Sequence, residues 1–481
     1  MDPQARTTHG WVSGRWAGDV AEFLGLPYAE PPVGELRLRP PRPPARWAGV
    51  RPCHAYGPAA PQPPADYNEG VPELLRGGDD YLNLNVFTPD PGGSGLPVLV
   101  WLHGGGFAAG GNASPWYHGG GFARSGVVLV TPNYRLGPEG FLPLAGGSAN
   151  LGVRDWVRAL EWVAANIAAF GGDPGAVTVG GQSAGGQAAV TLLAVPAAAG
   201  LFHRVIDMSG GSVAWEDAES ATAWARRYAG HLGVPPTREA FAALDPRATA
   251  EAHAGLERPG EGVLGRIFGE GTRGFNPFVD GEVVAGDPLD VLRSGTAAGV
   301  PLLVGSAAEE FNEVLRAQRG PLEAAEYAEA LRALDVGPRE REFYEERWPA
   351  GLEVLGQVLT DRLFRVPTLR VAQAHPGPVH LYDFRWRSPA NGGATGAGHC
   401  VDLPFVFDCL DAPGVERMCG PHPPAELAAR MHGAWAAFVR SGDPGWPRYG
   451  EHGAARVFDV PDAGLEADPL REESAFWPDL V

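Results

Sequence analysis

The sequence AVTVGGQSAGG, residues 176–186, is the most informative part of this 481-residue chain. Its first half is apolar and β-branched, which predicts a buried strand, and the small residues that follow (GQAAV, 186–190) predict a helix. The GQSAG sequence between them predicts a tight turn with a serine at its tip, where the N-terminus of the helix supplies partial positive charge. In a chain with 68 glycines this context, and not the bare pentapeptide, identifies Ser183 as a candidate nucleophile.

Strands and helices alternate on both sides of this stretch. Residues 155–169 place Trp156, Leu160 and Val163 on one stripe, as expected for an amphipathic helix. Other apolar runs predict strands buried on both faces, at 98–102, 127–131, 204–208, 301–305 and 380–384. We therefore predict an α/β fold with a central, mostly parallel sheet flanked by helices.

Two long segments, about 215–295 and 315–375, are rich in residues that favour helices, and no linker-like boundary sets them apart. We predict a single domain over residues 1–481, in which both segments are helical insertions on the sheet.

Composition excludes several functions. A net charge of −19 argues against binding to nucleic acid or to anionic membranes. All 38 basic residues are arginine, so lysine-dependent chemistry is unavailable.

The N-terminus does not resemble a signal peptide, and no apolar run is long enough to span a membrane. The four cysteines lack the spacing of metal ligands, so we expect a cytoplasmic protein without a metal. Its oligomeric state cannot be inferred, although a monomer fits.

A glycine-rich loop follows the strand at 98–102. Its sequence, HGGGF at 103–107, allows backbone amides to turn inward. Such N–H groups stabilise the oxyanion of an acyl-transfer transition state, and one donor contributes about 3–4 kcal/mol. The alternatives are a flexible loop or a phosphate loop, and the latter requires a lysine that the chain lacks.

A serine nucleophile needs a base, and 13 histidines are candidates. His399 lies in a loop before an apolar segment and follows Ser183 in the order serine, acid, histidine. By order alone three others compete, His380, His422 and His432. The acid should follow a strand between Ser183 and His399, and the strand ending at Gly305 is followed by two candidates, Glu309 and Glu310.

Six further motifs occur in one order along the chain. They are FLGLPYAEPP (23–32), YLNLNVFTP (81–89), NYRLG (133–137), FGGDP (170–174), HCVDLPFVF (399–407) and SGDP (441–444). Together with the two glycine-rich motifs, they make the chain resemble the type-B carboxylesterase/lipase family, which includes para-nitrobenzyl esterases and cholinesterases. The resemblance runs nearly end to end and implies an α/β-hydrolase fold, with the insertions lying over the active site.

The resemblance also implies roles for single residues. It makes His399 the catalytic base and Glu310, rather than Glu309, the acid. It implies three backbone oxyanion donors, those of Gly105, Gly106 and Ala184. It matches Ser209 to a buried serine that supports the triad. Two structural ion pairs are implied as well, Arg37 with Asp79 and Arg135 with Asp155.

Four departures from the family pattern stand out. Ala60 and Tyr81 replace the cysteines of an early disulfide. Gln182 replaces a glutamate often found before the nucleophile, and Phe311 replaces the glycine after the acid. The segment between Gln62 and Tyr81 contains no tryptophan that could hold a choline group.

The sequence thus predicts a carboxylic ester hydrolase that works through an acyl-enzyme, without metal or cofactor, on small to medium uncharged esters. Two alternatives stay open. One is a cholinesterase-like binding module without catalysis, and the other is a hydrolase specialised for lipids, amides or lactones.

Overall fold

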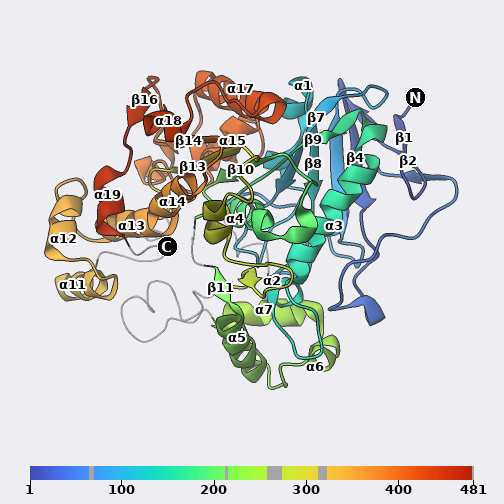
Figure 1. Cartoon of the computed structure of the whole chain (residues 1–481), viewed down its shortest axis with the longest axis horizontal. Coiled ribbons are helices and arrows are strands. Elements are labelled where there is room, and N and C mark those ends of the chain that lie inside the picture. The colour runs from blue at the N-terminus through green and yellow to red at the C-terminus, as the bar shows by residue number, and fades with distance from the viewer. Residues whose placement is uncertain (64–69, 212–214, 257–273, 313–321, 479–481) are drawn as a thin grey trace.

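Within the described residues, the fold is built on an 11-stranded sheet with the strand order β16-β15-β14-β13-β10-β9-β7-β8-β6-β4-β3 (Figure 1). The computed structural model describes residues 1–63, 70–211, 215–256, 274–312 and 322–478. The sheet strands are β3 (Arg15–Ala17), β4 (Val20–Pro27), β6 (Asn83–Thr88), β7 (Leu96–Leu102), β8 (Val128–Pro132), β9 (Gly172–Gln182), β10 (Arg204–Met208), β13 (Leu302–Ala307), β14 (Val379–Phe384), β15 (Ala454–Phe458) and β16 (Gly464–Ala467). The strands from β8 to β15 pair in parallel, and the outer pairs are antiparallel.

Each strand predicted from the sequence is present, and the predicted mostly parallel α/β fold is confirmed. The reason is visible in β7, whose residues alternate between two cores. Val98, Val100 and Leu102 belong to one hydrophobic cluster, whereas Leu99 and Trp101 belong to another. Both faces of the strand are buried, which is why the sequence is apolar without alternation.

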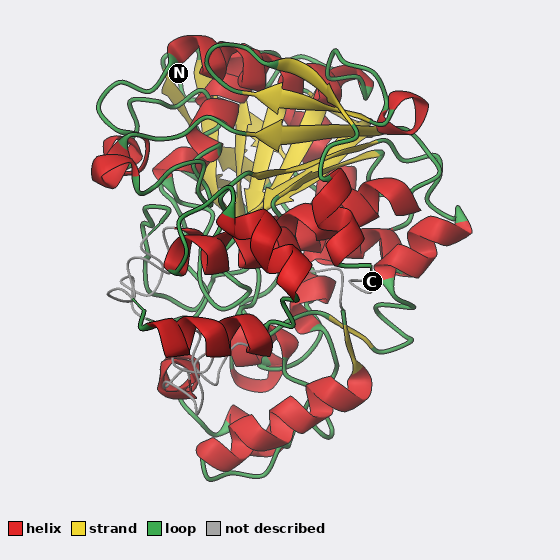
Figure 2. Ribbon diagram, turned by 90° about the vertical axis from the view of Figure 1, so that its left-hand side faces the viewer, coloured by secondary structure: helices red, strands yellow, loops and turns green. Residues whose placement is uncertain are grey.

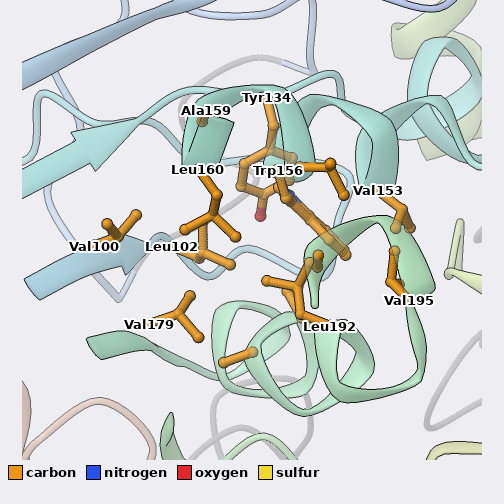
Figure 3. Packing of buried hydrophobic residues seen from close by; sticks show 14 of the residues in the cluster. Val100, Leu102, Tyr134, Val153, Trp156, Ala159, Leu160, Val179, Leu192 and Val195 are labelled. Carbon is orange, nitrogen blue, oxygen red and sulfur yellow. The ribbon is translucent and has the colours of Figure 1, made fainter. Parts of the chain in front are cut away.

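Helices cover both faces of the sheet (Figure 2). On one face lies α3 (Leu151–Asn166), whose Trp156 and Leu160 pack beside Val100 and Leu102 of β7 (Figure 3). On the other lies α17 (Ala425–Ser441), which supplies Trp435 to the second cluster. Helix α3 begins four residues before the predicted start and continues beyond Asn166 as a short 3₁₀ turn.

Further helices lie in the two segments noted above. From 215 to 295 they are α5 (Ala218–His231), α6 (Arg238–Ala242), α7 (Pro246–Leu256) and α9 (Pro288–Ser294). From 315 to 375 they are α11 (Ala324–Ala333), α12 (Pro338–Glu345), α13 (Leu352–Thr360), a π-helical turn (Asp361–Arg365) and α14 (Val366–Ala374). Within the described part of the chain, every helix is too short or too polar to cross a membrane.

The family resemblance predicted two ion pairs. The prediction for Arg135 is confirmed, and the prediction for Arg37 is wrong. Arg135 and Asp155 are 2.6 Å apart, and both side chains are fully buried. Arg37 pairs with Glu139 of α2 (Gly137–Phe141) at 2.7 Å, whereas Asp79 is exposed. Glu139 is itself only 2% exposed, so its charge requires a buried partner, and Arg37 is that partner.

Removal of one member of the Arg135–Asp155 pair should destabilise the fold strongly. We expect Asp155→Ala to lower the free energy of unfolding by about 3–5 kcal/mol, because the guanidinium would be left buried without its counter-ion. The surface pair of Arg448 and Glu451, 3.7 Å apart and more than half exposed, provides the control. Glu451→Ala should change little in the same urea titration. Equal effects of the two substitutions would contradict the expectation.

Candidate active site

Ser183 sits at the sharp turn between β9 and α4 (Ala184–Thr191). Its φ of 57° and ψ of −130° are strained for a residue with a side chain, as expected for an exposed nucleophile at a strand-to-helix turn. Its amide donates to the carbonyl of Met208 on the neighbouring strand β10, at 2.8 Å. A Cβ atom at Gly185 would lie 1.9 Å from the carbonyl oxygen of Leu102. The second glycine of the motif therefore lets α4 approach the end of β7.

The His399 ring is hydrogen-bonded to Glu310. Nδ1 lies 2.5 Å from Oε2 of Glu310, and Oε1 of the same carboxylate accepts the amide of Ala307 at 2.8 Å. Burial opposes protonation of the ring, but the negative charge of the Glu310 carboxylate, together with that of Cys400 in its thiolate form, outweighs burial and raises the pKa of His399 well above its usual value. Glu310 is thus the carboxylate that contacts the imidazole.

Glu309 has a different task. Its Oε2 accepts the amide of Ala397 at 3.0 Å, its own amide donates to the carbonyl of Ala397 at 2.9 Å, and its Oε1 pairs with Arg387. Glu309 therefore anchors the loop that precedes His399, whereas Glu310 holds the ring. Glu309 and Glu310 are adjacent in the sequence, but their side chains point in different directions and therefore contact different partners.

The three competing histidines lie elsewhere. His380 bonds to the carbonyl of Trp446, His432 bonds to the carbonyl of Val406, and His422 is exposed. They are satisfied structural or surface residues.

The loop at 103–107 lies against the nucleophile. A Cβ at Gly104 would be 3.2 Å from the Cβ of Ser183. Gly105 and Gly106 adopt φ values of 111° and 59°, which favour glycine, and within the described residues their amides have no hydrogen-bond acceptor. Ala184 is the first residue of α4, where helix amides lack internal partners. These three amides therefore have no acceptor among the described residues.

The second nitrogen of His399 contacts Gln182 rather than Ser183. Nε2 lies 3.2 Å from the side-chain nitrogen of Gln182, whose oxygen accepts the Cys400 thiol at 3.4 Å. Within the described part of the chain, the Ser183 hydroxyl has no hydrogen bond to the ring. Catalytic hydrogen bonds are often unformed in ligand-free enzymes. The sequence marked Gln182 as a departure from the family pattern, but it did not predict the contact between Gln182 and His399.

Phe311 connects to the site through a second ring. Its ring centroid is 5.5 Å from that of Phe364, which in turn lies 5.2 Å from the His399 ring. Phe364 belongs to the π-helical turn, a local irregularity frequent at functional sites. The large residue after the acid thus supports an aromatic wall beside the imidazole.

Two buried acids, Asp207 and Asp402, interact electrostatically with Glu310. Burial raises the pKa of Asp207 to about 7, and the Glu310 charge adds to the effect, although the Gly210 amide, 2.9 Å away, opposes it. Burial likewise raises the pKa of Asp402 to about 7, again with a contribution from Glu310. The sequence analysis did not identify Asp207 as part of the site. An acidic residue within the apolar run 204–208 could have indicated it, because a buried carboxyl in a strand is unusual.

Ser209 is fully buried at the end of β10. Its amide donates to the carbonyl of Gly305 at 2.8 Å, and its hydroxyl has no partner among the described residues. No cluster of three or more His, Cys, Asp or Glu side chains that could hold a metal occurs in the described ranges.

Comparison with known proteins agrees with this architecture. The sequence profile of the Carboxylesterase family matches residues 1–456. The chain is 36% identical over 482 residues to para-nitrobenzyl esterase of Bacillus subtilis (strain 168), covering 97% of this chain and 96% of that protein. It is 37% identical over 499 residues to phenmedipham hydrolase of Pseudarthrobacter oxydans, covering 96% of each. A solved structure of a PNB esterase superposes with a TM-score of 0.87 at 34% identity, covering 99% of both chains. With a family profile and full-length relatives in agreement with its fold, this chain belongs to the carboxylesterase family.

Proposed function

We propose that this protein hydrolyses carboxylic esters through an acyl-enzyme, with Ser183 as nucleophile, His399 as base and Glu310 as the acid that orients the base. The observation that carries the proposal is the 2.5 Å hydrogen bond between Glu310 and His399 beside a serine in strained turn geometry. The carboxylate favours the tautomer with a proton on Nδ1, which leaves Nε2 unprotonated and able to accept the serine proton.

In the first step, His399 takes the proton of Ser183 as its oxygen attacks the ester carbonyl. The oxyanion that forms accepts hydrogen bonds from the amides of Gly105, Gly106 and Ala184. The imidazolium then protonates the leaving alcohol, and a water molecule repeats the sequence to release the acid. These residues suffice for both steps without a metal or cofactor.

Supporting roles belong to the surrounding residues. Ser209, which is fully buried immediately after β10, has a supporting role for the triad. Residues 1–481 act as one catalytic unit, and the segments 215–295 and 315–375 are insertions that shape access to it. We propose no nucleic-acid or membrane partner.

For the substrate we propose a small to medium uncharged ester. The side chain next to the nucleophile, Gln182, is neutral, and the wall beside His399 is aromatic. Two relatives are named for the hydrolysis of para-nitrobenzyl esters and of phenmedipham. Lipid, amide and lactone hydrolysis are the competing specificities, since insertions usually determine them.

A fluorophosphonate probe tests the catalytic assignment directly. We expect one equivalent of label per chain on Ser183, because only an activated serine attacks phosphorus rapidly. The variant Ser183→Ala should take up none. A binding module without catalysis would leave the wild type unlabelled, and that result would overturn the proposal.

A panel of esters tests the substrate class. We expect the highest kcat/KM for short and medium acyl chains and a decline for long chains. A choline ester should have no advantage over its uncharged 3,3-dimethylbutyl analogue, which has the same shape, because Gln182 supplies no negative charge. A preference for emulsified long chains, or for the cation, would contradict this part of the proposal.

A further inference from the structure

Gln182 bridges the catalytic histidine and a cysteine. Its side-chain nitrogen is 3.2 Å from Nε2 of His399, and its oxygen accepts the thiol of Cys400 at 3.4 Å. Gln182 is 1% exposed and Cys400 is 8% exposed, so both side chains are buried. Both residues adjoin the site, one preceding Ser183 and the other following His399.

The thiol determines which way the amide faces. The neutral thiol donates to the amide oxygen of Gln182, and this arrangement turns the amide nitrogen toward the imidazole. An amide nitrogen can only donate, so Nε2 of His399 must be the acceptor. With Nδ1 donating to Glu310, this contact requires the neutral ring with its lone pair on Nε2, the form that a general base requires.

We propose that Gln182 is a positioning residue which, with its amide oriented by Cys400, keeps His399 in the neutral form that can accept the serine proton. The inference rests on the proposed function, since it assigns His399 as the base. When Nε2 becomes protonated, two N–H groups face each other, and the amide disfavours the imidazolium. Gln182 thereby opposes Glu310, whose charge favours the imidazolium.

Other titratable groups surround the ring and must be kept constant. Glu310 faces Nδ1, Cys400 adjoins the ring on its own loop, and Asp402 follows on the same segment. Asp207 interacts electrostatically with Glu310, and Glu309 is paired with Arg387. None of these residues except Cys400 is altered in the test.

The test compares Cys400→Ala with Cys400→Ser. In the alanine variant the amide can turn, its oxygen can accept a proton from Nε2, and the imidazolium gains a hydrogen bond. The acid limb of the kcat/KM profile should therefore move to higher pH by roughly half to one unit. The serine hydroxyl still donates to the amide oxygen, so the limb should return to its wild-type position. Gln182→Glu is the reference for sensitivity and should move the limb upward by about one unit or more.

Three results would overturn the inference. If the alanine and serine variants have the same midpoint, the orientation of the amide is irrelevant. If both midpoints fall, Cys400 acts on the ring directly as a thiolate. If Gln182→Glu leaves the midpoint unchanged, residue 182 does not face Nε2. Thermal unfolding of each variant shows whether it is folded.

A second readout separates this inference from the proposed function. The ionisation of His399 can be followed through its Nδ1 proton by NMR in the Ser183→Ala background, where no ester is turned over. The Cys400→Ala substitution should raise the midpoint of this titration, and Cys400→Ser should not. If Ser183→Ala retained hydrolysis, the proposed function would fail while this titration still decided the role of Gln182.

Discussion

Ser183→Ala should lower kcat for p-nitrophenyl acetate by at least about 10⁴-fold, because the oxygen that forms the acyl-enzyme is removed. The residual rate would come from the oxyanion amides and from substrate binding. The fold should be unaffected, since alanine and serine experience the same strain at φ 57° and the serine hydroxyl forms no hydrogen bond among the described residues. Steady-state kinetics and the thermal unfolding midpoint measure both effects.

Ser294→Ala provides the matched control. Ser294 is an exposed serine on α9, and its substitution should leave kcat unchanged. If Ser183→Ala kept more than a tenth of the wild-type rate, Ser183 would not be the nucleophile.

Glu310→Gln should lower kcat by about 10³–10⁴-fold. The amide retains the shape of the carboxylate but loses the charge that stabilises the imidazolium formed in each step. The amide nitrogen can also face Nδ1, which would select the wrong tautomer of His399. The pKa of His399 should fall in this variant, so the acid limb of kcat/KM should move to lower pH.

Glu309→Gln is the matched control for this substitution. The amide oxygen can still accept the amide of Ala397, so the loop before His399 keeps one of its anchors while the pair with Arg387 is lost. We expect a decrease in kcat of less than about tenfold, since an exposed partner of this kind contributes little. Equal losses in both variants would mean that the two carboxylates act as one unit.

Much of the fold could be predicted because its signals are local. The buried strands are contiguous apolar runs, and the stripe of Trp156 and Leu160 marks α3. The strand, turn and helix around Ser183 likewise occur within about twenty residues. For such patterns, the chain's own periodicity reports which side chains face the core.

The wrong prediction of the Arg37 partner arose because this ion pair is not a local feature of the sequence. Its true partner, Glu139, is 102 positions away, and the choice between Glu139 and Asp79 depends on which carboxylate is buried. Spacing along the chain carries no information about that choice. The family resemblance therefore transferred a pair that this chain does not form.

Local patterns along the chain predicted the α/β fold and the turn that presents Ser183, and the family resemblance implied the roles of His399 and Glu310. The folded structure was needed to show which carboxylate contacts the imidazole and that Gln182 and Cys400 lie on its other side. These residues come from different strands and loops, up to 218 positions apart. Hydrogen bonds act over about 3 Å, so their partners are chosen by the packing of the sheet and its loops rather than by order along the chain.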